Sequence, residues 1–217
     1  MVNIFQKLFN IVFNKKIGYD YDEDWLDNQI TIKKLKAAGN LRSPDIIAAF
    51  ESINKAWFMP FKDEYDNSDI NMEYKYAESD LLIHLFSPSI YSTILENLDL
   101  QQGHSFLNVG SGTGYLSSIC GCLIGSKGKN IGFEIHPKLI DFAFTVREKL
   151  EAALASKIWC PPEFKCINIF DFKTDEKFDR IFIGASMMEN QRTFICRMLK
   201  PFGIAILACD NKVCLMF

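Results

Sequence analysis

Residues 106–115 read Phe-Leu-Asn-Val-Gly-Ser-Gly-Thr-Gly-Tyr, an apolar run followed by three glycines at alternate positions. The apolar run predicts a short buried strand, and the residues from Tyr115 onward predict a helix. Glycine suits a turn that needs a positive φ, or a place where a ligand touches the backbone. In a doubly wound sheet the first such turn lies outside the carboxyl ends of the strands, where ligands bind.

Strands and helices alternate after this turn. We expect strands at residues 104–109, 130–135, 164–168, 179–184 and 203–209, and helices at residues 115–124, 137–153 and 189–199. Strands that alternate with helices favour right-handed crossovers and a parallel sheet covered on both faces. The C-terminal part of the chain therefore predicts an α/β fold with a Rossmann-like doubly wound sheet.

The first part of the chain is acidic and rich in helix signals. One helix is expected at residues 24–38, and a second from Ser43-Pro44 to about Lys55. Residues 60–80 are polar and acidic and are expected to form a long loop. We therefore divide the chain into a helical N-terminal extension, residues 1–80, packed on an α/β domain, residues 81–217.

Residues 4–13 are apolar and place Phe5 and Leu8 on one face of an amphipathic helix. Docking of this face on the rest of the protein is the interpretation we favour. The alternative is a weak membrane or partner contact, assisted by Lys15 and Lys16. No run in the chain reaches the roughly 18 consecutive apolar residues of a membrane-spanning helix.

Composition and charge exclude several classes of protein. With 217 residues, 48% of them hydrophobic, the chain can bury a sizeable core, and its net charge of -3 offers no basic field for nucleic acid. The seven cysteines are an odd number and form no Cys-x-x-Cys pair, and the three histidines lie far apart. We therefore expect a cytoplasmic, monomeric protein with reduced cysteines and no metal site.

The glycine spacing discriminates among nucleotide ligands. A dinucleotide fingerprint has its third glycine three residues after the second, where this chain has Tyr115. A Walker loop needs Gly-Lys-Ser/Thr, which is absent. Gly-x-Gly-x-Gly after an apolar strand instead fits S-adenosylmethionine, which has no phosphates and needs a close backbone floor for its methionine end.

Two polar side chains follow at the ends of the next two predicted strands. Glu134 lies 20 residues after Gly114 and can accept hydrogen bonds from both ribose hydroxyls, and Asn168 can bond the adenine edge. Alternatively, the glycines form only a tight turn and Glu134 is a solvated surface acid. The agreement of strand, turn and helix favours the cofactor site.

The run from Phe86 to Glu134 resembles the protein-L-isoaspartate O-methyltransferases, through Ser87-Pro88, residues 106–115 and Ile131-Gly132-Phe133-Glu134. It is closer to the relatives called protein-L-isoaspartate O-methyltransferase domain-containing proteins. In those, Asn replaces the acid of the first strand, as at Asn108, and the loop reads Ser-Ala-Pro-x-Ile-Tyr-Ser. Here that loop is Phe86-Ser87-Pro88-Ser89-Ile90-Tyr91-Ser92. The resemblance extends over about residues 20 to 215.

This resemblance implies a class I methyltransferase fold that binds S-adenosylmethionine and methylates the carboxylate of L-isoaspartyl residues in damaged proteins, a repair reaction. A carboxylate is already ionised at pH 7, so the reaction needs attack geometry and no general base. Together with the glycine loop, the implied cofactor contacts are Ser87, Pro88, Ser89, Ile90, Gly110, Ser111, Gly112, Gly114, Glu134, Ile135, Ile167 and Asn168.

Two departures from the family pattern bear on activity. The active enzymes have Ser or Thr two places before the loop proline, where this chain has Phe86; a one-place slip would let Ser87 supply the catalytic hydroxyl. The family fold also continues into a final strand pair. Residues 213–217 can begin that pair, but the chain stops at Phe217, so we expect the pair to be incomplete, with an unpaired apolar edge.

A second class of function stays open beside the enzyme. A catalytically weak adaptor of the ubiquitin-ligase substrate-receptor type would bind S-adenosylmethionine and recognise proteins without methylating them. His84 is interpreted as a residue that packs or bonds locally rather than as a base, since carboxylate attack needs none. Tyr74, Tyr76 and Tyr91 line a substrate groove in one interpretation and only pack in the other.

Overall fold

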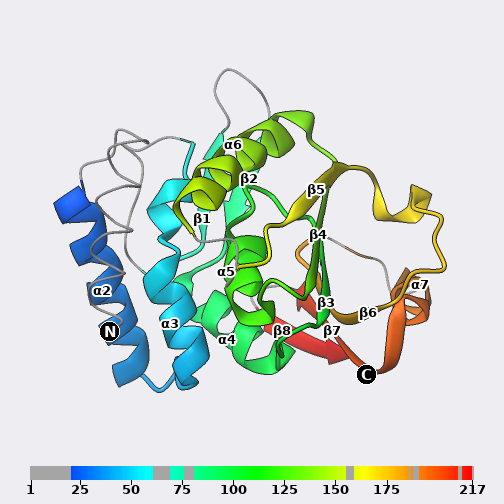
Figure 1. The fold of residues 1–217 in the computed structure, drawn as a ribbon, viewed down its shortest axis with the longest axis horizontal. Coiled ribbons are helices and arrows are strands. Elements are labelled where there is room, and N and C mark those ends of the chain that lie inside the picture. Colours follow the sequence, from blue (N-terminus) through cyan, green and yellow to red (C-terminus); the bar gives the residue numbers. More distant parts are fainter. Residues whose placement is uncertain are drawn as a thin grey trace.

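The structure is a computed structural model that describes residues 21–60, 69–75, 81–154, 159–185, 187, 191–209 and 212–216. Its centre is a six-stranded sheet in the order β5-β4-β3-β6-β7-β8 (Figure 1). The strands are β3 (Ser105–Val109), β4 (Lys129–Glu134), β5 (Glu163–Cys166), β6 (Phe178–Ile183), β7 (Leu199–Cys209) and β8 (Lys212–Met216). All neighbours from β5 to β7 pair in parallel. The predicted doubly wound α/β sheet is confirmed.

Successive residues of a strand point to opposite faces of the sheet. The apolar residues of these strands therefore lie on both faces, and both faces are buried. On β3, Phe106 joins one buried cluster and Leu107 joins another. The helices of this region are α4 (Pro88–Leu98), α5 (Tyr115–Ile124), α6 (Pro137–Ala153) and α7 (Arg192–Arg197). The bounds of α5 and α6 match the expectation from sequence.

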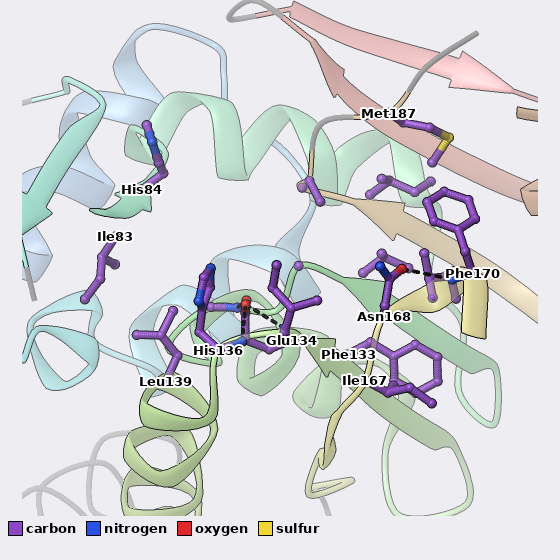
Figure 2. A pocket seen from close by; sticks show the side chains of 18 residues that line it. Ile83, His84, Phe133, Glu134, His136, Leu139, Ile167, Asn168, Phe170 and Met187 are labelled. Atoms are coloured by element: carbon purple, nitrogen blue, oxygen red, sulfur yellow. Dashed lines mark hydrogen bonds between the residues drawn. The ribbon is translucent and has the colours of Figure 1, made fainter. Parts of the chain in front are cut away.

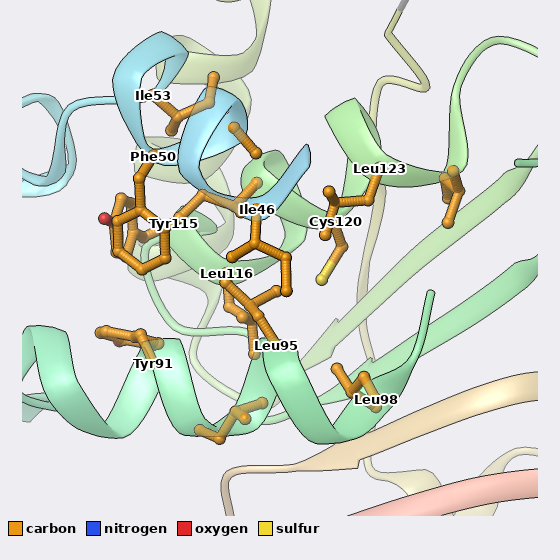
Figure 3. Close-up of a cluster of buried hydrophobic side chains, with 14 of the residues drawn as sticks. Ile46, Phe50, Ile53, Tyr91, Leu95, Leu98, Tyr115, Leu116, Cys120 and Leu123 are labelled. Carbon is orange, nitrogen blue, oxygen red and sulfur yellow. The ribbon is translucent and has the colours of Figure 1, made fainter. Parts of the chain in front are cut away.

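One continuous core joins the N-terminal helices to the sheet. α2 (Tyr21–Ala37), α3 (Pro44–Ser52) and the 3-10 turn η1 (Lys55–Phe58) precede the sheet in the chain, and α2 and α3 contact α4 (Figure 1). Phe50 of α3 belongs to the same buried cluster as Leu95 of α4 and Leu116 of α5 (Figure 3). Phe106 of β3 belongs to it as well, so the helices pack directly over the sheet.

A small antiparallel hairpin lies outside the main sheet. It consists of β1 (Met72–Lys75) and β2 (Leu82–Leu85). The sequence predicted a loop throughout residues 60–80, and this is wrong for β1. The strand is short and polar, and it is stabilised by a cluster that includes Met72, Leu85 and Leu139 of α6, a contact between distant parts of the chain.

The C-terminal strand has a partner. β8 pairs antiparallel with β7, from Ala205 opposite Met216 to Cys209 opposite Lys212. The prediction of a strand near the C-terminus is therefore confirmed, and no further strand pairs with β8 among the described residues, as the expected incomplete strand pair requires. Among the described residues, β8 forms the outer edge of the sheet.

Some predictions concern residues outside the described ones, including the apolar segment 4–13 and the side chains of Tyr74 and Tyr76. In the part of the chain that the structure describes, no helix combines the length and apolarity needed to cross a membrane.

Candidate active site

A cavity of about 340 Å³ lies at the carboxyl ends of β3, β4 and β6 (Figure 2). Val109, Glu134 and Ile183, the last residues of these strands, line it. Six of the residues predicted to contact a cofactor also line it: Gly110, Gly112, Glu134, Ile135, Ile167 and Asn168. Residues that are distant in sequence thus meet where a doubly wound sheet binds its ligand.

Three glycines shape the turn after β3. Gly110, Gly112 and Gly114 have φ values of +76°, +55° and +90°, a region that favours glycine. A Cβ on Gly110 would lie 3.1 Å from Ala185, and one on Gly114 would lie 2.6 Å from Phe164. A Cβ on Gly112 would meet no atom within 4 Å. Gly110 and Gly114 therefore permit close packing, whereas Gly112 borders open space at the cavity.

Glu134 ends β4 and is only 7% exposed. Its Oε1 accepts hydrogen bonds from the backbone N–H groups of Ile135 (2.8 Å) and His136 (3.1 Å). Its Oε2 accepts one from the N–H of Gly112 (3.0 Å). The carboxylate therefore links the glycine loop to the end of β4, and it lines the cavity (Figure 2).

Asn168 lies two residues beyond β5, which ends at Cys166 rather than at residue 168 as predicted. Its Oδ1 accepts a hydrogen bond from the N–H of Phe170 (3.1 Å) and caps the 3-10 turn η3 (Ile169–Asp171). The side-chain nitrogen Nδ2 has no partner among the described residues. The amide therefore offers the cavity a hydrogen-bond donor.

Apolar side chains form the wall between these two polar groups. Ile135 is 58% exposed and Phe170 is 40% exposed, and both line the cavity with the half-buried Ile167. Exposed large apolar side chains that gather at one place mark a binding surface. This wall suits the face of a flat ring.

A second, smaller cavity of about 50 Å³ adjoins the first and shares His84, Gly110, Gly112 and Gly184 with it. The other residues that line it are Leu85, Phe86, Tyr91, Asn108, Ser111, Thr113, Tyr115, Leu116 and Phe182.

Three buried oxygen atoms on residues of the smaller cavity have no hydrogen-bond partner among the described residues. They are Oδ1 of Asn108, Oγ of Ser111 and Oγ1 of Thr113. Buried polar atoms without partners are rare and cost free energy, so a group of them calls for a ligand. Asn108 donates its Nδ2 hydrogen to Ser117 Oγ (2.9 Å), which fixes the direction of its free oxygen.

The side chains of the loop that we expect to contact the cofactor make local hydrogen bonds. Ser87 is the N-cap of α4, where its Oγ accepts a hydrogen bond from Ile90 N–H (3.4 Å) and lies 2.9 Å from Ser89 Oγ. The N–H of Ser87 donates to Asn71 Oδ1 (2.8 Å). Ser87, Pro88, Ser89 and Ile90 line neither cavity, and nor does Gly114.

The residues just before this loop border the cavities, and the sequence did not assign them to the cofactor site. Ile83 lines the larger cavity, Leu85 and Phe86 line the smaller one, and His84 lines both. The signal in the sequence that could have identified them is the position of this apolar run immediately before the Ser-Pro motif. Its assignment to a strand depends on pairing with β1, which the sequence did not reveal.

Phe86 is held firmly at the smaller cavity. Its carbonyl accepts a hydrogen bond from Lys55 Nζ (2.9 Å), and its backbone also bonds the hydroxyl of Tyr91. Its ring packs edge-to-face on Tyr91 and Phe182, with centroid distances of 5.7 Å and 6.3 Å. Burial raises the pKa of Tyr91, so the phenol stays neutral and takes part in the packed core.

No group of three His, Cys, Asp or Glu side chains that could hold a metal ion occurs within the described ranges of the chain. The polar groups at the two cavities are instead an acid, amides, hydroxyls and two imidazoles, which suit an organic ligand.

Comparison with known proteins gives a consistent family. A family model described as protein-L-isoaspartate(D-aspartate) O-methyltransferase matches residues 26–213. The protein-L-isoaspartate O-methyltransferase of Triticum aestivum is 28% identical over 179 residues, which cover 81% of this chain and 74% of that protein. Protein-L-isoaspartate O-methyltransferase 1 of Arabidopsis thaliana is 26% identical over 191 residues, which cover 85% and 78%.

Solved structures share the fold. A candidate protein-L-isoaspartate O-methyltransferase from Plasmodium falciparum, in complex with S-adenosyl-L-homocysteine, has a TM-score of 0.67 and 19% identity, with 87% of each chain covered. Another structure, named protein-L-isoaspartate O-methyltransferase, has a TM-score of 0.68 and 24% identity, with 83% of this chain and 54% of that chain covered. At these identities the likeness establishes the fold.

Proposed function

Because the chain belongs to the protein-L-isoaspartate(D-aspartate) O-methyltransferase family, we propose that it transfers a methyl group from S-adenosylmethionine to the carboxylate of L-isoaspartyl residues in damaged proteins. It is a methyltransferase with a class I fold, and S-adenosylmethionine is its cofactor. The observation that carries the proposal is the meeting of Glu134, Asn168 and the open backbone at Gly112 around one cavity.

The residues around the larger cavity fit the adenosine part of the cofactor. We assign the ribose hydroxyls to Glu134 and an acceptor nitrogen of adenine to the Nδ2 donor of Asn168, with Ile135 and Ile167 against the ring. The methionine part extends over Gly112 toward the smaller cavity. The unpartnered oxygens there, including Thr113 Oγ1, support this direction because they need a polar ligand.

The carboxylate of Glu134 limits how the ribose is held. A carboxylate has about four lone-pair sites, and three backbone N–H groups take up about three of them. One ribose hydroxyl can bind directly. A second ribose hydroxyl can bind only if it shares a lone pair of Glu134 with a backbone N–H, or if the N–H of Gly112 is released. Cofactor binding is therefore coupled to the position of the glycine loop.

When bound, the cofactor supplies a methyl group on a positively charged sulfur. The acceptor carboxylate is ionised at pH 7, so the protein has no proton to remove. The work of the chain is to orient the two reactants and exclude water, which can lower the barrier by about 7–11 kcal/mol when the alignment is good. No observation favours the adaptor alternative over this enzyme.

We also propose that the chain works as a monomer in the cytoplasm. The support for the compartment is chemical: an odd number of cysteines without Cys-x-x-Cys pairs suits a reducing compartment. Burial raises the pKa of Cys120 and brings that of Cys122 to about 12, so both thiols stay protonated. Light scattering tests the monomer, and imaging of the tagged chain tests the compartment.

The proposed activity is tested with radiolabelled S-adenosylmethionine and a matched pair of peptides, one with isoaspartate and one with aspartate at the same position. We expect label in the isoaspartyl peptide only, and its release by mild base, as for an ester. Cofactor binding without transfer to either peptide, or label that resists base, would contradict the proposal.

A further inference from the structure

One ionisable side chain borders both cavities. His84 lines the larger and the smaller cavity, beside Gly110 and Gly112. Apart from two tyrosines, it is the sole described residue lining the smaller cavity that can carry a charge. Leu85 and Phe86, the next two residues of the chain, line the smaller cavity as well.

Glu73 fixes the orientation of the His84 ring. The two residues are opposite each other in the β1–β2 pairing, and Nδ1 of His84 lies 3.0 Å from Oε1 of Glu73. An ionised carboxylate only accepts hydrogen bonds, so Nδ1 carries the hydrogen of this bond. Nε2 has no partner among the described residues and becomes a donor when the ring is protonated.

Other charged groups near His84 have different roles. The ionisable side chains on the surrounding elements are Glu73 and Lys75 of β1, Lys55 of η1, and Glu134 and His136 at the junction of β4 and α6. Lys55 donates to the carbonyl of Phe86, and Glu134 accepts three backbone hydrogen bonds. His136 lines only the larger cavity (Figure 2).

We propose that protonated His84 binds the acceptor carboxylate through Nε2–H at the junction of the two cavities, with Glu73 holding the ring. This inference rests on the proposed function, which provides the isoaspartyl carboxylate. A charge-assisted hydrogen bond is short, so it can hold the carboxylate in attack geometry. In the transfer a carboxylate oxygen bonds the methyl carbon, and the C–S bond breaks with its electron pair on sulfur. His84 keeps its proton throughout.

A dependence of acceptor binding on pH follows. Nε2 donates a hydrogen only when the ring is protonated, so acceptor affinity should fall when a higher pH removes that proton. Cofactor affinity does not follow the same course, because the adenosine part is bound by Glu134 and Asn168.

The test measures the affinity of an isoaspartyl peptide for the full chain saturated with S-adenosylhomocysteine, by fluorescence anisotropy at about pH 6 and about pH 8. His84→Leu removes the donor and is expected to weaken binding about tenfold to a hundredfold at the lower pH. His84→Gln places an amide nitrogen near the position of Nε2. It is expected to restore much of the affinity and to remove the difference between the two pH values.

A matched control is His104→Leu, the same change at a histidine that precedes β3 and lines neither cavity, which should leave peptide affinity unchanged. Calorimetry gives the affinity of each variant for S-adenosylhomocysteine, and circular dichroism verifies that each variant is folded. If His84→Leu does not fold, the peptide affinity of His84→Gln tests the role of His84. Unchanged peptide affinity in folded His84 variants, or an equal loss of S-adenosylhomocysteine affinity, overturns the inference. Peptide binding that depends on His84 without methyl transfer overturns the proposed function and supports the role of His84.

Discussion

The carboxylate of Glu134 serves both the fold and the proposed cofactor site. It holds the glycine loop through Gly112 and the start of α6 through His136, and it also borders the cavity. In the proposed site, the same two oxygen atoms would hold the glycine loop and bind the ligand. A change at this residue should affect binding more than its loss of a single ribose contact would suggest.

We expect Glu134→Gln to weaken S-adenosylhomocysteine binding by at least about tenfold to a hundredfold, since the loss of one charged hydrogen bond of about 1.5–3 kcal/mol alone has this effect. Glutamine retains one carbonyl oxygen, so it cannot accept all three backbone bonds and a ribose bond. Calorimetry measures the effect. Glu163→Gln on β5 is the matched control, because Glu163 is exposed and lines neither cavity. If the Glu134 variant and the wild type bind S-adenosylhomocysteine with equal affinity, the assignment of the ribose hydroxyls to Glu134 is wrong.

The resemblance to the family places Phe86 where the active enzymes have Ser or Thr. Phe86→Ser is expected to raise kcat/KM for an isoaspartyl peptide by up to about tenfold to a hundredfold. It should also lower stability, since its edge-to-face contacts with Tyr91 and Phe182 are lost. Radiolabel kinetics and thermal melts measure the two effects. If the folded variant is no faster than the wild type, the missing hydroxyl does not limit the reaction.

Phe202 has a backbone conformation that its side chain disfavours. Its φ is +63° and the residue is 99% exposed. Phe202→Gly relieves about 1–2 kcal/mol of strain and costs about 0.5–1 kcal/mol of chain entropy. We therefore expect a rise in Tm of about 1–4 °C. Phe202→Ala retains the Cβ and should give no such rise; equal stabilisation by both variants would point to side-chain exposure as the cause.

At the scale of single residues, the sequence predicted some positions and missed others for physical reasons. Glu134 and the glycines were identifiable because their spacing follows from the strand–turn–helix geometry. The catalytic role that the sequence suggested for Ser87 stays a prediction, and its role as a helix cap depends on the helix that follows it. Here α4 begins at Pro88, and the hydroxyl of Ser87 is used at its N-terminus.

At the scale of elements, Asp179 connects three parallel strands. Its Oδ2 accepts hydrogen bonds from the N–H and Oγ of Ser105 (both 2.7 Å) and from Lys200 Nζ (2.8 Å). These residues belong to β6, β3 and β7. Burial alone would raise the pKa of Asp179, but the hydrogen bonds from Lys200 and Ser105 outweigh it and hold that pKa well below its usual range.

The lowered pKa of Asp179 makes the stability of the folded protein depend on pH. A carboxyl with a lowered folded-state pKa stabilises the protein fully above its ordinary pKa of about 4, and this stability is lost as the pH falls through the folded-state value. Asp179→Asn should therefore lower Tm at neutral pH more than at about pH 2–3. Asp175→Asn, at an exposed acid before β6, is the control. An equal decrease at both pH values for the Asp179 variant would show that the charge is not responsible.

Elements with strong local signals were predicted well, and those formed by distant contacts were not. α5 and α6 begin at residues whose signals are local, a glycine turn and a proline at the first helical position. β1 has no such signal, because it pairs with β2 and packs on Leu139 of a later helix. His84 lies on this hairpin, so the sequence predicted only local packing or bonding for it and not its position at the two cavities.

At the scale of the whole molecule, the strand order determines where the site lies. β3 is central, with β4 on one side and β6 on the other, so the chain reverses its direction of winding beside it. The turn after β3, Glu134 after β4 and Gly184 after β6 consequently meet at one end of the sheet. The location of the site at this end of the sheet is predictable from the alternation of strands and helices in the sequence. The hairpin that borders the cavity is not, because it depends on packing between distant parts of the chain.

The shared core predicts how the molecule unfolds when a ligand is bound. We propose that residues 1–80 form an extension that does not unfold separately from the α/β domain 81–217, because Phe50 and Phe106 belong to one buried cluster. S-adenosylhomocysteine at about 100 times its Kd stabilises the folded state by about 2.7 kcal/mol, which corresponds to a Tm rise of about 5–11 °C. Scanning calorimetry should show one transition that shifts as a whole. Two transitions, of which the ligand moves only one, would mean that the N-terminal helices unfold independently of the site.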